Sequence, residues 1–171
     1  MTPQAGTAPS VFGFESDFAG SLRCIPMAVR QKLDLVGIKL TLRQWSRLGA
    51  VQRQALLQEP CGDAGEIAGY GAALRGVLEC MGEMAAPVTA DIALWQDRAE
   101  VPAIVVSQAQ AKGAVAPTPA QWRRLTSLQR FALIKLARPG HENENFLPAM
   151  VEFGLVLPRN ERRTGAAHLA E

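Results

Sequence analysis

The sequence is poor in the residues that build disulfide frameworks and metal centres. It has three cysteines, Cys24, Cys61 and Cys80, which are widely spaced and form no Cys-x-x-Cys pair. Because an odd number of distant cysteines does not suit a secreted disulfide framework, we expect reduced thiols in a cytoplasmic protein. The two histidines, His141 and His168, have no partner at metal-binding spacing. A zinc site needs about four ligands, so we predict no metal site. Convergence of the cysteines with His141 is the alternative.

Segments that direct a protein into or through a membrane are also missing. Residues Met1–Phe14 contain neither the basic region nor the leucine-rich stretch of a signal peptide. The charge-free run Val101–Ala111 ends at Lys112, well short of the roughly 18–20 apolar residues that cross a bilayer. We therefore expect a cytoplasmic, soluble protein without a membrane partner.

The sequence lacks the common motifs of nucleotide binding and hydrolysis. It contains no Gly-x-Gly-x-x-Gly, no Walker loop and no Gly-x-Ser-x-Gly. The formal net charge of +2 is too small to predict nucleic-acid binding by itself. Charge is uneven, however, with +3 over residues 1–60, −5 over residues 61–100 and +4 over residues 101–171. Solvated helix faces account for this pattern, and a polarised surface for a charged partner is the alternative.

What the sequence does contain is enough apolar residues for one globular domain. Of its 171 residues 48% are hydrophobic and 20% are charged, which is an ordinary globular composition. The ends differ from the rest, because the first is rich in proline and alanine and the last is polar and charged. We predict disordered tails at residues 1–11 and 158–171, and a single helical domain at residues 12–157.

A short segment with a rare tryptophan occurs twice. Residues 44–56 and 121–133, which are 77 positions apart, share eight of thirteen residues, including Trp45 and Trp122. Upstream, Gly37 matches Gly113 at an offset of 76. We interpret these matches as an internal duplication, with repeat units at about residues 24–85 and 100–157.

Each repeat unit has the pattern helix–Gly–helix–helix. Gly37 and Gly113 stand where the end of a helix requires positive φ, and Thr41 and Thr118 can cap the helix that follows. The fold class predicted is all-α, a helical bundle built from two duplicated units with a pseudo-two-fold relation. A long helix over about residues 63–84 and shorter ones near 89–98 and 142–153 complete it. No alternating run predicts a sheet.

The repeated tryptophans have two interpretations. Trp45 with Leu48, and Trp122 with Leu125, lie three residues apart on an apolar helix face, so we assign these four residues to the core. Stacking on a cofactor or a base is the alternative. The repeated arginines also have two interpretations. They can bond carbonyls at helix ends, or they can form two related anion sites. They are Arg47 and Arg53 in the first unit, and Arg124 and Arg130 in the second.

Two acidic residues near the beginning, Glu15 and Asp17, stand two positions apart. A hydrolytic acid–base pair is conceivable for such a spacing. A salt bridge to Arg23 or a helix-capping role is the preferred interpretation.

One stretch is more specific than any generic motif. It reads Phe12-Gly13-Phe14-Glu15-Ser16-Asp17-Phe18, then Ser21-Leu22-Arg23-Cys24-Ile25-Pro26-Met27-Ala28-Val29-Arg30, then Lys32-Leu33-Asp34, Gly37-Ile38-Lys39-Leu40 and Trp45. This stretch resembles the opening of the nitrate reductase-associated protein family, which reads much like FxFExDFxxSLRCIPMxVRxKLDxxGIKL. The similarity is dense over about residues 12–60 and looser to about residue 157. It implies a small cytoplasmic protein, best known in cyanobacteria, whose gene lies near those for nitrate reductase and molybdopterin synthesis.

The resemblance, together with the missing catalytic motifs, implies a non-catalytic accessory protein. It would associate with assimilatory nitrate reductase and assist its maturation, cofactor loading or activity. No resident cofactor is expected, and a molybdopterin-type ligand is the open alternative. Because phosphates need cationic or N–H donors, the candidate partner- or anion-binding residues are Arg23, Arg30, Lys32 and Lys39.

Two other classes of function stay open. A helical nucleic-acid-binding or regulatory module is supported by the basic residues Arg123, Arg124, Arg130, Lys135 and Arg138, and its DNA binding would weaken with salt. A thiol-dependent enzyme would use Cys24, because a reactive thiol needs a cationic neighbour such as Arg23.

Overall fold

The computed structural model describes residues 11–157, apart from the side chains of His141 and Glu142. The predicted tails lie outside this range except for Val11. The chain is mainly helical, which confirms the helical class. One feature was not expected: strands β1 (Ile38–Lys39) and β2 (Ala86–Pro87) form a short antiparallel pair. No helix in the described part of the chain has both the length and the apolar character needed to span a membrane.

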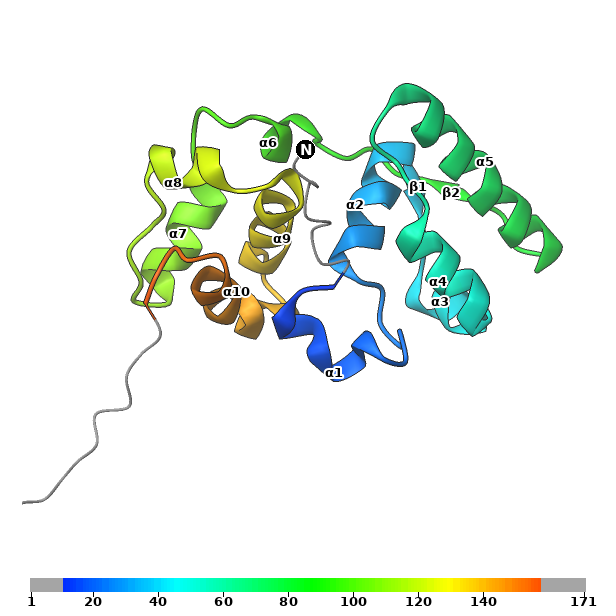
Figure 1. Ribbon diagram of the computed structural model, residues 1–171, viewed down its shortest axis with the longest axis horizontal. Helices are drawn as coiled ribbons and strands as arrows, with labels where there is room; N and C mark the ends of the chain where they lie inside the picture. Colours follow the sequence, from blue (N-terminus) through cyan, green and yellow to red (C-terminus); the bar gives the residue numbers. More distant parts are fainter. Residues whose placement is uncertain (1–10, 158–171) are drawn as a thin grey trace, which may run out of the picture.

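The helices form two halves that lie side by side (Figure 1). The N-terminal half consists of α2 (Met27–Val36), α3 (Leu42–Arg47), α4 (Ala50–Gln58) and α5 (Ala64–Cys80). The C-terminal half consists of α6 (Ala93–Gln96), α7 (Ala103–Ala111), α8 (Pro119–Arg124), α9 (Ser127–Ala137), η2 (His141–Asn145) and α10 (Phe146–Glu152). The first described elements, η1 (Gly13–Glu15) and α1 (Ser16–Ala19), lie between the halves (Figure 1).

Threonine side chains begin α3 and α8 in the same way. The Thr41 hydroxyl accepts a hydrogen bond from the Gln44 backbone at 3.1 Å, and the Gln44 side chain accepts one from the Thr41 backbone at 3.0 Å. Thr118 and Gln121 exchange the same two bonds at 3.2 and 2.9 Å. Each cap satisfies backbone N–H groups that have no partner within the helix. The caps expected from the sequence are therefore present.

In each unit, one glycine ends the first helix. Gly37 has φ 67° after α2, and Gly113 has φ 69° after α7. Glycine adopts this left-handed conformation without the steric cost that a Cβ atom brings. In both α2–α3–α4 and α7–α8–α9, a glycine thus follows the first helix and a threonine cap begins the second helix.

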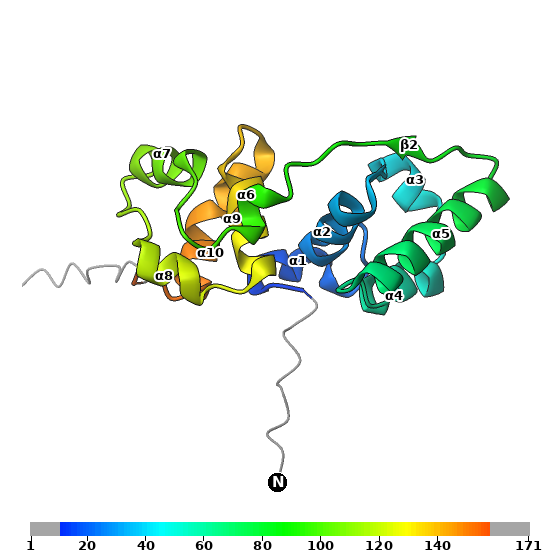
Figure 2. The ribbon, with the colours of Figure 1, turned by 90° about the horizontal axis from the view of Figure 1, so that it is seen from above.

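The predicted pseudo-two-fold relation between the units is not confirmed. The two halves meet through α2 and α9, where Lys135 Nζ lies 2.8 Å from Asp34 Oδ2 and Gln31 donates to Ser127 at 2.9 Å. A two-fold axis would require α7 to pack on α4 in the same way. Instead α7 and α4 lie at opposite ends of the molecule (Figures 1 and 2). The units therefore adjoin through different helices.

Each half has its own hydrophobic core. Trp45 and Leu48 belong to the core of the N-terminal half, and Trp122 and Leu125 to that of the C-terminal half. Both tryptophans are fully buried. Between the two cores, the partly buried side chains of Leu35 and Leu128 contact both clusters, so burial of apolar surface also holds the halves together.

Candidate functional site

A pocket of about 430 Å³ opens where the two halves meet. Its lining residues come from η1, α1, α2, β1, α3 (Leu42), α9 and η2 (Asn145), from the segments directly before α2 and after β1, and from Val88. Most of the lining side chains are apolar, namely Phe14, Phe18, Ile25, Met27, Leu33, Ile38, Leu40, Leu42, Val88 and Leu136. A concave, mainly apolar pocket with a few charged groups is the usual form of a binding site.

Glu15 fixes the N-terminal wall of the pocket. One carboxylate oxygen accepts from the Met27 backbone N–H at 2.8 Å, and the other accepts from that of Phe12 at 3.0 Å. The first bond satisfies the backbone N–H of the first residue of α2, a contact that the sequence did not predict. Glu15 is buried, and burial raises the pKa of its carboxyl group although both hydrogen bonds oppose this shift. Its oxygens serve the fold and are not available to a hydrolytic reaction.

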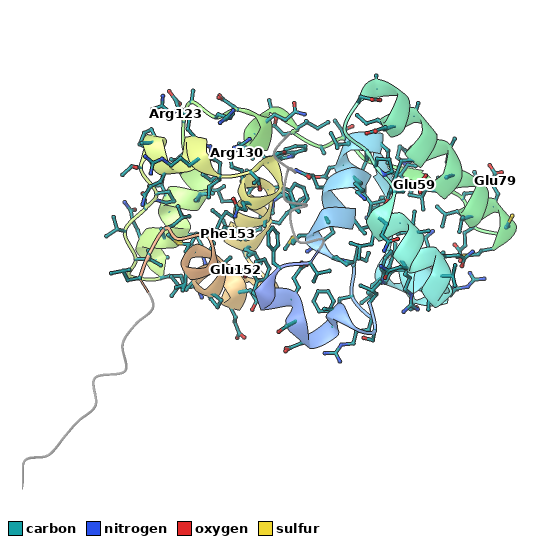
Figure 3. All side chains as sticks on the ribbon, in the orientation of Figure 1. Glu59, Glu79, Arg123, Arg130, Glu152 and Phe153 are labelled. Atoms are coloured by element: carbon teal, nitrogen blue, oxygen red, sulfur yellow. The ribbon has the colours of Figure 1, made fainter. Side chains whose placement is uncertain are left out.

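A second carboxylate, that of Glu152, holds the same segment from the opposite side. It accepts from the backbone N–H of Gly13 at 2.8 Å and from that of Phe14 at 3.2 Å. Because Glu152 belongs to α10, these bonds attach the N-terminal segment to the C-terminal half (Figure 3). The pocket wall is therefore tied to both halves.

The Asp34–Lys135 ion pair separates the pocket from a smaller one. Both side chains are largely buried, and both line the main pocket and a neighbouring pocket of about 110 Å³. Trp95 also lines the smaller pocket, and its indole N–H is buried without a hydrogen-bond partner in the described residues. No pattern in the sequence indicated that Asp34 and Lys135, which are 101 positions apart, would meet here.

The four predicted anion-binding residues do not come together. Arg30 and Lys39 line the pocket, whereas Arg23 is exposed and stands next to the pocket residue Cys24 without lining the pocket itself. Arg30 also acts on Glu15 electrostatically: the positive charge of Arg30 lowers the pKa of the Glu15 carboxyl group. Two cations of the predicted set thus reach one site, and a third lies beside it.

Lys32 has a different position, at the end of α4. Its ammonium group donates to the carbonyls of Leu56 at 3.3 Å, Leu57 at 2.8 Å and Glu59 at 2.5 Å. Carbonyls at a helix C-terminus attract cations, so Lys32 closes α4 against α2. Burial lowers the pKa of Lys32. The donors of this residue are used within the fold.

The three cysteines differ in their burial and surroundings. Cys24 is half-buried at the pocket, Cys61 is buried and Cys80 is exposed. Burial raises the pKa of the Cys61 thiol, although Lys32 opposes this shift. Among the described residues, no group of three or more His, Cys, Asp or Glu side chains could hold a metal ion.

The repeated tryptophans and arginines bond backbone carbonyls. The Trp45 indole donates to the Leu22 carbonyl at 2.7 Å, and the Trp122 indole donates to that of Asp97 at 3.3 Å. Arg53 donates to the carbonyls of Trp45 at 3.2 Å and Ser46 at 2.8 Å. The contacts of Arg53 agree with the helix-end interpretation, whereas Arg47 forms an ion pair with Glu83 and also donates to the Met81 carbonyl at 3.1 Å. Neither tryptophan lines the pocket.

The basic residues that suggested nucleic-acid binding do not form one surface. Arg130 is buried and donates to the carbonyls of Trp95 and Leu125, and Lys135 pairs with Asp34. Figure 3 shows Arg130 inside the C-terminal half and Arg123 at its edge. A positive face for a phosphate backbone would need both groups in solvent, so the structure does not favour this alternative.

Comparison with known proteins gives one match. A family model described as conserved nitrate reductase-associated protein matches residues 11–153, which is most of the chain. No curated protein and no solved structure matches. The matched range contains every residue that lines the pocket.

Proposed function

Because the chain belongs to the conserved nitrate reductase-associated protein family, we propose that it is a non-catalytic, cytoplasmic accessory protein that binds assimilatory nitrate reductase. Association with nitrate reductase is what the family description states, and the family match over residues 11–153 is the observation that carries the proposal. Assistance to maturation, cofactor loading or activity is the role that we propose for this binding.

We place the contact with the reductase at the rim of the main pocket. Lys39 and Arg23 are exposed there, and the Leu42 side chain is 56% exposed at the same opening. Protein interfaces combine an apolar centre with a polar rim and are enriched in arginine. A partner with an apolar side chain and neighbouring carboxylates would complement this rim.

The pocket is a poor match for a molybdopterin-type ligand. Arg30 and Lys39 suit one anionic group, and the carboxylates of Glu15 and Asp34 are engaged by backbone N–H groups and by Lys135. The polar edge of a pterin would lie against apolar walls without hydrogen-bond partners, which is costly. The proposal therefore gives this chain no cofactor of its own, and the effect on cofactor loading would come from contact with the reductase.

We also propose that the two helix–Gly–helix–helix units arose by internal duplication. The shared residues of 44–56 and 121–133 support this proposal, as do the matching caps at Thr41 and Thr118 and the positive φ of Gly37 and Gly113. The duplicated element would be the unit itself, since the two units pack in the molecule through different helices.

The direct test is binding between the purified full chain and purified assimilatory nitrate reductase. We expect Arg23→Ala with Lys39→Ala to raise the Kd at least tenfold. The matched control is Arg123→Ala with Arg124→Ala, which removes the same charge from exposed positions on α8 and should change the Kd less than twofold. Molybdenum measured in the isolated complex reports whether the bound reductase carries its cofactor. Absence of binding, or equal loss in both double variants, contradicts the proposal.

A further inference from the structure

The main pocket has the size and lining of a site for a small molecule. Its volume of about 430 Å³ falls in the range of roughly 300–1,000 Å³ that is typical of such sites. Several of its apolar side chains are open to solvent: Phe14, Phe18 and Ile25 are only partly buried, and Leu42 is mostly exposed. When an apolar group covers concave apolar surface of this kind, the free energy falls because that surface is removed from water.

The charged groups at the pocket are unequal in what they can offer a ligand. Both oxygens of Glu15 accept backbone N–H groups, and Asp34 is paired with Lys135. Lys39 is exposed at the opening and makes no ion pair within the described residues. Arg30 adds a second positive charge to the lining of the pocket. The carboxylates are therefore engaged by the fold, whereas a cation remains at the mouth.

We propose that this pocket binds a small amphipathic anion, with an apolar body against the Phe14, Ile25 and Leu42 side chains and one carboxylate, sulfonate or phosphate group at Lys39. Such a ligand covers the open apolar surface and places its charge beside a solvent-exposed ammonium group. This site goes beyond the contact with the reductase and does not depend on it.

The test uses the full chain alone and three probes that separate the apolar and charged contributions. The probes are 1-naphthalenesulfonate, its neutral analogue 1-naphthalenemethanol, and inorganic phosphate, each titrated by calorimetry. We expect the sulfonate to bind at one site per chain, the neutral analogue to bind about tenfold more weakly, and phosphate alone to give no measurable binding. Sulfonate binding that is absent or spread over several sites overturns the proposal.

Variants then place the probe in the pocket. Lys39→Gln, at an exposed position, should weaken sulfonate binding about tenfold and leave the neutral analogue unchanged. Leu42→Trp fills the opening and should weaken both probes. The matched control is Val51→Trp on α4, which is 83% exposed outside the pocket and should change neither. Unchanged sulfonate binding in both pocket variants overturns the assignment. Because the reductase is absent from this assay, its outcome is separate from that of the proposed association.

Discussion

Replacement of Arg130 by methionine tests how the C-terminal half is held together. Arg130 lies on α9, is 4% exposed, and donates to the Trp95 carbonyl at 2.8 Å and to the Leu125 carbonyl at 2.5 Å. These carbonyls belong to α6 and to the end of α8. One guanidinium group therefore joins three helices, and Arg130→Met keeps an unbranched apolar stem but removes every donor.

The expected loss of stability follows from the two buried bonds. A hydrogen bond with a charged group contributes about 1.5–3 kcal/mol, and an acceptor left buried without a partner costs a similar amount. Burial lowers the pKa of Arg130, which means that the fold disfavours its charge, and removal of that charge offsets part of the loss. We expect Arg130→Met to lower the free energy of unfolding by about 3 kcal/mol.

Arg53→Met is the matched control, because Arg53 occupies the corresponding position in the first unit. Arg53 also donates to backbone carbonyls, at 2.8 and 3.2 Å, but it is only partly buried. Water can replace it, so we expect a loss of about 1 kcal/mol. Urea unfolding of the full chain, followed by circular dichroism and by tryptophan fluorescence, measures both values. A loss below 1 kcal/mol for Arg130→Met, or a larger loss for Arg53→Met, would refute the reasoning.

Three further predictions concern stability. Gly37→Ala and Gly113→Ala should each cost about 1–2 kcal/mol in thermal unfolding, because both glycines have positive φ and a Cβ atom at either position makes no contact shorter than ordinary van der Waals distance; no measurable cost at either position would contradict this. Burial raises the pKa of Glu15 above 4.5, so its stabilising contribution is complete below pH 4.5 and is lost as the pH rises through the folded-state pKa; the stability of Glu15→Gln should lack this decline above pH 4.5. Lys135→Met should cost about 3 kcal/mol, because it leaves Asp34 unpaired between the halves; a double-mutant cycle with Asp34→Leu isolates the pair, and additive losses would argue against it.

Local structure was the part of the fold that the sequence predicted well. The caps at Thr41 and Thr118 and the glycines Gly37 and Gly113 act within a few residues of the chain, so their effect is visible in the sequence. The two-residue strand pair was missed because an alternation of apolar and polar residues needs a longer run to be recognised. The packing of the units through α2 and α9 was also outside the reach of a repeat pattern, which records similarity and not contact.

The candidate site was predicted only in part, for the same reason. Arg30 and Lys39 belong to the dense family-like segment and do line the pocket. Lys32 lies in the same segment, but the end of α4 comes close to it only in the folded chain, and three carbonyls take its donors. Lys135 had no local signal at all, because its partner Asp34 is distant in sequence. The residue types in the sequence identified the candidate cations. Only the tertiary structure shows which of them line the pocket and which bond within the fold.

The central claim is that this chain acts by binding nitrate reductase at the side where its two halves meet. Hydrogen exchange of the full chain, measured with and without purified assimilatory nitrate reductase, tests it most directly. We expect slower amide exchange in residues 14–25 and 38–43, which include residues that line the pocket, and unchanged exchange in α7 and α8. Protection confined to α7 and α8, or no protection at saturating reductase, would contradict it.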